Sequence, residues 1–319
     1  MPHLESDPAF HLVGNTPMVP LHRLFANNKG IEVFAKLEYY NPSGSVKDRI
    51  VVHILRDAEK TGKLRPGMTV VEASSGNTGA ALAFFCARLG YKLILTTMTK
   101  VSEEKKNHMR MLGAEVIVCP TDVHHDSPEH YINRAAQIAR ETPNSFHVNQ
   151  YDNPLNTEAH YLTTGPEIWR QMDGRVDWLV TGGSTGGTIT GAAKYLKEQN
   201  PALKVLLPDP KGSALYHIAK TGVSREEDLG PYQVEGVGKE CLTDAIDITV
   251  VDESMQYSDA DAFGLCRACA RLEGILPGLS AGGNLAGVQW LMDRIPGPAR
   301  IVTIVQDAGV KYLSKLLKD

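Results

Sequence analysis

Short apolar runs alternate with longer amphipathic segments along most of this chain, and that alternation restricts the fold more than any other feature. The runs at 31–38, 68–73 and 92–97 have the length and the aliphatic content of buried strands, and a helical pattern follows each of them. Strands joined by helices of this length need right-handed crossovers, which make neighbouring strands parallel. The sequence therefore predicts an α/β fold built on mostly parallel, twisted sheets flanked by helices.

The alternation continues to the C-terminus, apart from one segment. We expect helices to begin at the N-cap residues Ser102 and Ser127, and a helix to end at Gly90. The stretch 209–245 is rich in glycine, proline and charge, and we expect it to be irregular. Further strands are expected at 114–119, 146–150, 176–182, 203–209 and 299–305, and helices at 45–64, 77–90, 102–113, 127–141, 156–172, 186–200, 259–274 and 284–292, followed by a terminal helix.

The length and the composition describe an ordinary globular enzyme. The chain has 319 residues, more than one average domain, and it contains no low-complexity tract or long linker. We therefore expect two α/β lobes that share one cleft. Its 33 Lys and Arg against 37 Asp and Glu leave a formal net charge of −4, which argues against general attraction to nucleic acid or an anionic membrane.

Several features point to a cytoplasmic protein. No apolar run approaches the ~20 residues of a membrane-spanning helix, and the segment 1–10 lacks the basic start and apolar core of a secretory signal. An odd number of cysteines, mostly in apolar-looking segments, argues against a disulfide framework in a chain this long. These cysteines are Cys86, Cys119, Cys241, Cys266 and Cys269.

Three glycine-rich turns, at 74–79, 183–188 and 278–283, are each expected to follow a strand and precede a helix. At such a place backbone N–H groups converge at a helix N-terminus and can bind an anion without a basic side chain. None of the turns matches G-x-x-x-x-G-K-[ST], and none is G-x-G-x-x-G with an acidic residue about twenty positions later. The pattern therefore disfavours a nucleotide P-loop and a dinucleotide-binding fold, and favours other anionic ligands.

Lys47 lies in the segment Asn41-Pro42-Ser43-Gly44-Ser45-Val46-Lys47-Asp48-Arg49, at the expected start of a helix. The positive end of the helix and partial burial both disfavour the ammonium form, and a lowered pKa is what a Schiff-base lysine requires. A lone lysine of this kind is more often exposed and paired with a carboxylate. The three anion-binding turns shift the balance toward the reactive lysine.

Two other clusters have simpler interpretations. The residues His124, His125, Asp126 and His130 match no standard zinc spacing, so we expect a polar loop and no metal. The Cys266-x-x-Cys269 pair lies within an expected helix, so we expect both cysteines to be packing residues.

The ordered motifs resemble those of the cysteine synthase and cystathionine β-synthase family of pyridoxal-phosphate (PLP) enzymes, the tryptophan synthase β-like second fold type. The resemblance covers nearly the whole chain and implies a PLP-dependent enzyme with the cofactor in the cleft between two lobes. It implies a smaller lobe at 41–145, which is mobile and carries the substrate loop, and a larger lobe formed by 1–40 and 146–319. The motifs are VGNTPM from residue 13, NPSGSVKDR, SSGNTG, NQY, TTGPEIW, GGTITG, VEGVG, GLSAG and YLSKLL.

The resemblance also implies roles for individual residues. Lys47 would bind PLP covalently, Asn77 would contact the cofactor's 3′-oxygen, and Ser280 would face the pyridine nitrogen, with Asp307 as a lesser alternative. The phosphate would be held by Ser184, Thr185, Gly186, Gly187 and Thr188. The amino-acid substrate would contact Ser74, Ser75, Gly76, Thr78, Gln150, Tyr151, Glu235 and Gly236.

The implied reaction is β-replacement on L-serine or an O-activated L-serine through an aminoacrylate. A thiol nucleophile would give cystathionine or cysteine, and an amine nucleophile would give a diaminopropionate-type product, as in siderophore-precursor synthases. Glu235 is typical of cystathionine β-synthases, but Lys239 and Glu240 replace the aromatic and acidic residues usual there, so the nucleophile stays open. Ser184 replaces the glycine that usually begins the phosphate turn, and this requires a negative φ at that position.

Two rivals and one further expectation remain. A serine or threonine dehydratase would use the same fold and release the aminoacrylate. A non-catalytic scaffold would bind a partner through the cleft, and intact Lys47, Asn77 and Ser280 argue against it. The family resemblance also implies a homodimer with each site complete within one chain.

Overall fold

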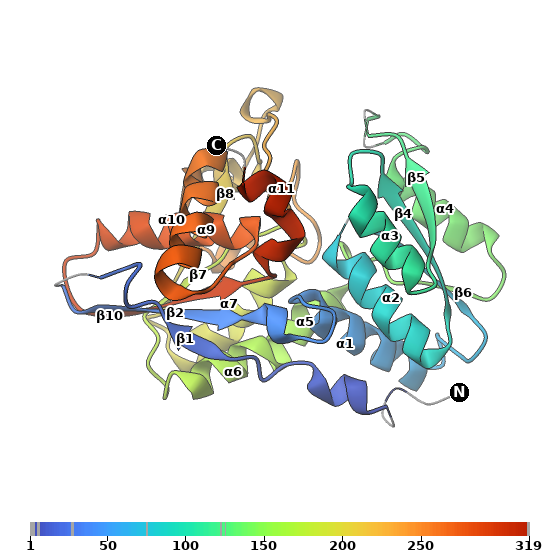
Figure 1. Ribbon diagram of the computed structural model, residues 1–319, viewed down its shortest axis with the longest axis horizontal. Coiled ribbons are helices and arrows are strands. Elements are labelled where there is room, and N and C mark those ends of the chain that lie inside the picture. The colour runs from blue at the N-terminus through green and yellow to red at the C-terminus, as the bar shows by residue number, and fades with distance from the viewer. Residues whose placement is uncertain are drawn as a thin grey trace. The chain divides into compact units, whose positions relative to one another are not determined.

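The computed structural model describes residues 4, 7–26, 29–74, 76–121, 123–124 and 126–317. The chain divides into two compact units, each an α/β assembly (Figure 1). Unit 1 comprises Met1–Val13 and Asn41–Asn156, and unit 2 comprises Gly14–Tyr40 and Thr157–Asp319. The predicted α/β class, with mostly parallel sheets flanked by helices, is confirmed.

Unit 1 is built on a parallel four-stranded sheet of order β5-β4-β3-β6. The helix α4 packs on β3 and β4 through Tyr131, Ala135 and Ile138, while α2 packs on β4 and α1 packs on α2 (Figure 1). The elements are η2 (Pro8–Leu12), α1 (Lys47–Lys60), β3 (Thr69–Ala73), α2 (Asn77–Leu89), β4 (Lys92–Met98), α3 (Glu103–Met111), β5 (Glu115–Cys119), α4 (Tyr131–Glu141), β6 (Ser145–His147) and the start of α5 (Pro154–Leu162).

Unit 2 is built on a six-stranded sheet of order β1-β2-β10-β7-β8-β9, parallel except for β1. Two apolar cores cover its faces, one formed with α9, α10 and α11 and the other with α6, α7 and α8. The elements are β1 (Met18–Pro20), β2 (Ile31–Leu37), η3 (Glu38–Tyr40), α6 (Thr164–Gln171), β7 (Trp178–Val180), α7 (Gly187–Gln199), β8 (Lys204–Pro210), α8 (Leu215–Thr221), η4 (Glu226–Asp228), η5 (Ile248–Val250), β9 (Glu253–Tyr257), α9 (Asp259–Glu273), α10 (Leu279–Met292), β10 (Ala299–Val305), η6 (Gly309–Tyr312) and α11 (Leu313–Leu316).

The observed units differ from the predicted lobe boundaries at two places. Residues 1–13 and 146–156 belong to unit 1, whereas the sequence assigned both to the larger lobe. Phe10 stacks against Phe85 at 4.8 Å, and the N–H of Val148 donates to the carbonyl of Val71 at 3.1 Å. Long-range aromatic and strand contacts of this kind leave no local signal in the sequence.

Some helix boundaries follow the predicted caps and others do not. Ser102 caps α3 as predicted, and Gly90 ends α2 with a left-handed φ of +74°. Ser127 does not cap α4, because that helix begins after His130 and the Ser127 carbonyl accepts the N–H of His130 in a preceding turn. The prediction of Ser127 as an N-cap was wrong.

The helix predicted at 156–172 is two helices, α5 and α6, separated at Thr163. A continuous helix would need an N–H from residue 166 to the carbonyl of Leu162, and Pro166 has no N–H. The Thr163 hydroxyl instead closes α5 by donating to the carbonyl of Ala159 at 2.6 Å.

The third glycine-rich turn also differs from its prediction. Residues 279–283 belong to α10, and the segment follows α9 and an isolated bridge between Pro277 and Ala308. Ser280 therefore lies in the first turn of a helix that no strand precedes. The sequence could not show this, because glycine, serine and alanine are common both in turns and in closely packed helices.

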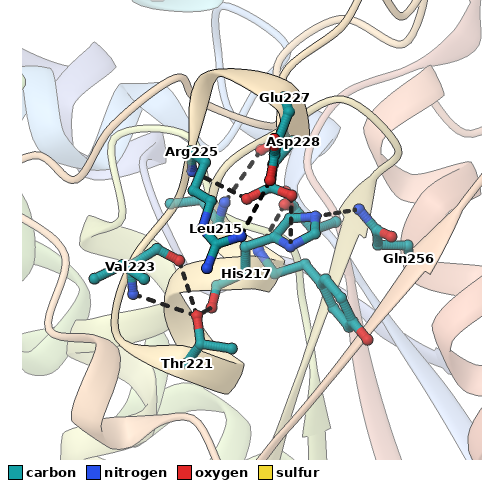
Figure 2. Close-up of polar contacts among 11 residues, drawn as sticks. Leu215, His217, Thr221, Val223, Arg225, Glu227, Asp228 and Gln256 are labelled. Carbon is teal, nitrogen blue, oxygen red and sulfur yellow. Dashed lines mark hydrogen bonds and ion pairs between the residues drawn. The ribbon is translucent and has the colours of Figure 1, made fainter.

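The segment 209–245 is irregular as predicted, except for the last two residues of β8, for α8 and for η4. Figure 2 shows how the chain after α8 folds back on that helix. His217 Nδ1 lies 3.4 Å from Asp228 Oδ1, and His217 Nε2 lies 3.3 Å from the Gln256 amide nitrogen. The Thr221 hydroxyl donates to the His217 carbonyl at 2.8 Å. Side-chain contacts thus replace regular structure here. In the part of the chain that the structure describes, no helix is long and apolar enough to span a membrane.

Candidate functional site

In unit 1, Lys47 is the first residue of α1, as predicted, and its side chain is half-buried. The turn before it is closed by Asp48, a fully buried residue that accepts the N–H of Ser43 at 2.7 Å and also the Ser43 hydroxyl. Gly44 has φ +81°, a conformation that other residues rarely adopt. The backbone that carries Lys47 is therefore held firmly at the positive end of a helix.

The turn after β3 is organised by one serine side chain. Ser74 is buried, and its hydroxyl oxygen accepts the N–H of Gly79 at 2.8 Å and of Gly76 at 3.3 Å. A Cβ at Gly79 would lie 2.6 Å from the Met109 sulfur, so a larger residue here would force the Met109 side chain to move. Asn77 is the first residue of α2. The predicted contact Ser75 lies outside the described residues.

Gln150 is held by four hydrogen bonds in unit 1. Its Oε1 accepts the Thr78 hydroxyl at 2.7 Å, and its Nε2 donates to the Ala73 carbonyl at 3.0 Å. Its carbonyl accepts from Asn156 Nδ2 at 2.8 Å, and its N–H donates to Glu72 Oε2 at 3.2 Å. Since these contacts assign both ends of the amide, one hydrogen on Nε2 remains for a ligand.

Two ionisable residues near Gln150 have shifted pKa values. Burial raises the pKa of Glu72 to about 8, against the opposing effect of backbone N–H donors. Burial also raises the pKa of Tyr151 well above its ordinary value, and the Tyr131 hydroxyl lies 3.0 Å from the Tyr151 hydroxyl. Sequence reasoning missed Glu72, although a single acid in the otherwise apolar strand TVVEA was a signal.

In unit 2, the turn at 184–188 leads from β7 into α7 and forms the N-terminus of a 13-residue helix. Gly186 is the N-cap with φ +89°, and a Cβ there would lie 2.1 Å from Ile246 Cβ. Thr185 is buried, and its carbonyl accepts the Thr243 hydroxyl at 2.7 Å. Ser184 is not among the residues with positive φ, as its side chain requires. The turn therefore presents main-chain N–H groups suited to an anion.

A buried histidine joins this turn to α6. His160 Nε2 lies 3.1 Å from the Thr188 hydroxyl, and its Nδ1 lies 2.8 Å from the Thr164 hydroxyl. His160 is fully buried. No local sequence pattern indicates a role for His160, because its partner Thr188 is 28 positions away. His160 restricts how the Thr188 hydroxyl can be directed.

Ser280 is buried at the N-terminus of α10, and its hydroxyl donates to Gln306 Oε1 at 3.3 Å. A Cβ at Gly236 would lie 4.0 Å from the Ser280 hydroxyl oxygen, so unit 2 brings these two predicted residues together. Asp307 accepts the Tyr312 hydroxyl at 2.6 Å, and its carboxylate lies against Gly278, where a Cβ would meet it. We infer from these contacts that Asp307 has a structural role.

The segment 232–239 is tied to the rest of unit 2 by polar contacts. Glu235 forms an ion pair of 3.0 Å with Lys315, and the N–H of Gly238 donates to the Gly183 carbonyl at 2.7 Å. The second contact links this segment to the start of the anion-binding turn. Lys239 exchanges hydrogen bonds with Ser213, which fixes the end of the segment.

The remaining clusters have structural contacts. Cys266 and Cys269 are buried in α9, and burial raises the pKa of both thiols to about 12. His124 lies 3.4 Å from Asp126 in an exposed pair, and His125 lies outside the described residues. Within the described ranges, no three His, Cys, Asp or Glu side chains are placed to hold a metal ion.

Comparison with known proteins agrees with the motifs. The model of the family described as "Pyridoxal-phosphate dependent enzyme" matches residues 9–307. Cystathionine β-synthase of Apis mellifera is 40% identical over 309 residues, 96% of this chain and 60% of that protein. Cysteine synthase 1 of Neurospora crassa is 38% identical over 307 residues, 95% of this chain and 81% of that protein. The chain thus spans less than two thirds of the length of the Apis relative.

The fold is also similar to that of solved structures. The crystal structure of O-ureido-L-serine synthase matches with a TM-score of 0.87 and 30% sequence identity, over 96% of this chain and 93% of that one. The family predicted from the ordered motifs is confirmed.

Proposed function

Because the chain belongs to the family of pyridoxal-phosphate-dependent enzymes, with PLP as its cofactor, we propose that it catalyses β-replacement on L-serine or an O-activated L-serine. A thiol is the favoured nucleophile, giving cystathionine or cysteine. Relatives named cystathionine β-synthase and cysteine synthase, at 40% and 38% identity, support this proposal.

The single observation that carries the proposal is the turn at 184–188. A phosphate monoester is bound by several N–H donors, and side chains near them must be small enough to let it approach. This turn combines a helix N-terminus with a glycine N-cap that admits no Cβ. The side chain of Thr188 adds a hydroxyl directed by His160. The donor set therefore fits the phosphate of PLP.

The other contacts of the cofactor and the substrate are proposed from both units. In unit 1, Lys47 would hold the cofactor and Asn77 its 3′-oxygen, while Ser74, Ser75, Gly76, Thr78 and Gln150 would bind the substrate carboxylate. Thr78 already donates its hydroxyl to Gln150, so only its backbone N–H would serve the carboxylate. In unit 2, Ser280 would face the pyridine nitrogen, and Glu235 and Gly236 would line the substrate site, with Tyr151 contributing from unit 1.

Bound PLP withdraws electrons from the substrate Cα, which allows loss of the Cα proton and of the group on Cβ. The amine of Lys47 would take the Cα proton and later return it. Ser280 would offer the pyridine nitrogen a neutral hydroxyl in place of a carboxylate, and such a partner would favour loss of the Cβ group over transamination or racemisation. Gln150 and the turn at 74–79 keep the carboxylate in place.

An amine nucleophile is the second candidate. The similar structure is that of an O-ureido-L-serine synthase, whose name describes an O-substituted serine, so it supports a nucleophile other than a thiol without indicating an amine. Lys239 and Glu240 also depart from the residues usual in cystathionine β-synthases at these positions. Keto-acid release from serine alone, unaffected by added thiols, would instead identify a dehydratase.

The test begins with the cofactor and continues with the substrates. The purified protein should absorb visible light, and borohydride reduction followed by peptide mass mapping should label Lys47. Serine, O-acetylserine and O-phosphoserine are then screened with sulfide, homocysteine and amino-acid amines. We expect turnover with a thiol and none in Lys47→Ala. An unlabelled Lys47 overturns the proposal.

We also propose a cytoplasmic homodimer. All five cysteines are free, which is consistent with a reducing compartment. The dimer is proposed from the family resemblance, and light scattering of the purified protein tests it. A monomeric mass at micromolar concentration contradicts it.

A further inference from the structure

Glu72 is a buried acid that the proposed reaction does not use. It is 1% exposed, and it is the one ionisable residue of β3, all five residues of which are buried. A carboxyl group in such a strand costs free energy unless specific partners satisfy it. Its position directly before the turn at 74–79 raises the question of what it holds.

The Glu72 carboxyl group joins two chain segments. Its Oε1 accepts the N–H of Ala73 at 2.9 Å, and its Oε2 accepts the N–H of Gln150 at 3.2 Å. Regular pairing of β3 with β6 ends at Val71 and His147. Beyond that point, the Glu72 side chain therefore links the segment after β3 to the segment after β6, where main-chain sheet hydrogen bonds have ended.

The separated segments carry the two sides of the proposed carboxylate site. Gln150 continues the segment after β6, and Ser74 and Gly76 continue β3. The Gln150 amide is oriented by Thr78 and by the Ala73 carbonyl, which leaves one Nε2 hydrogen for a ligand. A change at Glu72 moves the Gln150 backbone and therefore this hydrogen.

We propose that Glu72 is a positioning residue for the α-carboxylate of the amino-acid substrate. Through its hydrogen bonds it holds Gln150 in place, and the negative charge that it gains on ionisation repels the bound carboxylate. The inference rests on the proposed function, since it takes residues 74–78 and Gln150 as the carboxylate site.

The surroundings of Glu72 determine its charge. Burial raises its pKa to about 8, and the nearby carboxylate of Asp152 acts in the same direction. The N–H groups of Gln150, Ala73 and Asn149 oppose this. Glu72 is therefore mostly protonated at neutral pH and ionises within the range in which such enzymes are assayed.

The elements packed against β3 contribute few other titratable groups. From β6, His147 has its pKa lowered by burial, and after β6 Tyr151 has its pKa raised well above 10. From α4, Tyr131 bonds to Tyr151, and Arg134 donates to Gln137. The β4 partner of Glu72 is Leu95, and the first two turns of α2 contain no ionisable residue. Of the groups with shifted pKa values in these elements, Glu72 is the one whose pKa lies between 7 and 9.

The experiment measures ligand affinity of the PLP-loaded protein. L-Alanine has no leaving group on Cβ, so its affinity reports binding without turnover. L-Alaninamide lacks the carboxylate charge, so comparison with it isolates the effect of that charge. Affinities are titrated at pH 7 and 9 in the wild type, in Glu72→Gln and in Glu115→Gln, a control that neutralises an exposed acid of β5. Comparing each ligand with itself between variants cancels the ligand's own titration. PLP content and Lys47 labelling are measured first.

When the pH rises from 7 to 9, we expect alanine affinity in the wild type and in Glu115→Gln to fall about tenfold relative to its change in Glu72→Gln. Alaninamide affinity should change equally in all three proteins, and PLP content should stay unchanged. An alanine pH response in Glu72→Gln equal to that of the wild type overturns the inference. If Glu72→Gln does not fold, Glu72→Met is compared with the wild type in the same way. Loss of Lys47 labelling in the wild type overturns the proposed function itself, whereas binding without a pH difference overturns only the role of Glu72.

Discussion

Two turns of the molecule have the same local architecture but are stabilised differently. One follows β3 in unit 1 and the other follows β7 in unit 2. Each leads from a parallel strand into a 13-residue helix. In unit 1 side chains hold the turn, since Ser74 accepts two N–H groups and Thr78 donates to Gln150. In unit 2 the cap residue Gly186 packs against Ile246, and side chains hold the turn only from outside it, through Thr243 at Thr185 and His160 at Thr188.

This difference matches the two ligands that the turns are proposed to bind. Main-chain N–H groups packed by apolar residues bind a phosphate that stays in place between reaction cycles. Side chains linked by hydrogen bonds bind a carboxylate that enters and leaves in each cycle, and a titratable group can tune them. Mutations should therefore act through steric strain in unit 2 and through polarity and charge in unit 1.

The largest expected effect is steric and belongs to unit 2. Gly186→Ala places a methyl group 2.1 Å from Ile246 Cβ at a φ of +89°, so we expect a loss of about 3 kcal/mol or more in unfolding free energy and loss of bound PLP. Gly222→Ala is the matched control, because φ is +80° there and nothing lies within 4 Å of the added Cβ. It should cost only about 1 kcal/mol and retain PLP. Urea unfolding and PLP absorbance measure both, and equal losses would contradict the steric argument.

The next effect separates the units by pH. A buried acid with a raised pKa keeps a proton that the unfolded chain has released, so unfolding free energy falls as pH rises. Burial raises the pKa of Asp209 in unit 2 from 3.8 to about 7, so its contribution to stability should fall between these pH values. Burial raises the pKa of Glu72 in unit 1 from 4.5 to about 8, and its contribution should fall over that range. Each contributes at most about 1.4 kcal/mol per pH unit.

Urea unfolding between pH 5 and 8.5 tests this separation. Asp209→Asn should flatten the fall below pH 7, and Glu72→Gln should also flatten the fall between pH 7 and 8. Glu115→Gln on the exposed side of β5 should leave the profile as it is. A wild-type stability that rises with pH in this range would refute the argument.

A smaller effect isolates the hydrogen bonds of unit 1. Thr78→Val removes the hydroxyl that orients Gln150, so we expect about 1 kcal/mol of destabilisation and a KM for the amino acid about tenfold higher, with PLP retained. Thr97→Val is the control, because the buried Thr97 hydroxyl has no hydrogen-bond partner. That variant should be as stable as the wild type or more so. Equal KM values in the two variants would show that the Gln150 amide needs no support.

The sequence predicted the regular elements well where periodicity was strong. The strand at 299–305 matches β10 at both ends, and the helix predicted at 259–274 matches α9 within one residue. The strands β1 and β9 were missed, since MVP and ESMQY show little apolar periodicity. Helix α8 was missed because it lies in a segment dominated by glycine, proline and charge.

The glycine-rich turns were located from the sequence, but what holds them was not. Glu72 contacts a residue 78 positions away, and His160 contacts Thr188 across two helices. The cause of the glycine at 186 is Ile246, which no local pattern connects to it. Local spacing thus predicts where a turn lies, and only tertiary packing explains why it keeps its shape.

The smallest expected effect concerns Lys315 of α11, which forms an ion pair with Glu235 and donates to the Gln233 carbonyl at 2.8 Å. The side chains of Lys315 and Glu235 are 33% and 38% exposed, so Lys315→Met should cost about 0.5 kcal/mol of stability, less at high salt. Lys220→Met breaks a similarly exposed pair with Glu253, on the edge strand β9, and should cost no more. If Glu235 contacts the second substrate, only Lys315→Met should also raise the KM for the nucleophile, by about twofold. Identical kinetics in the two variants would show that this ion pair serves stability alone.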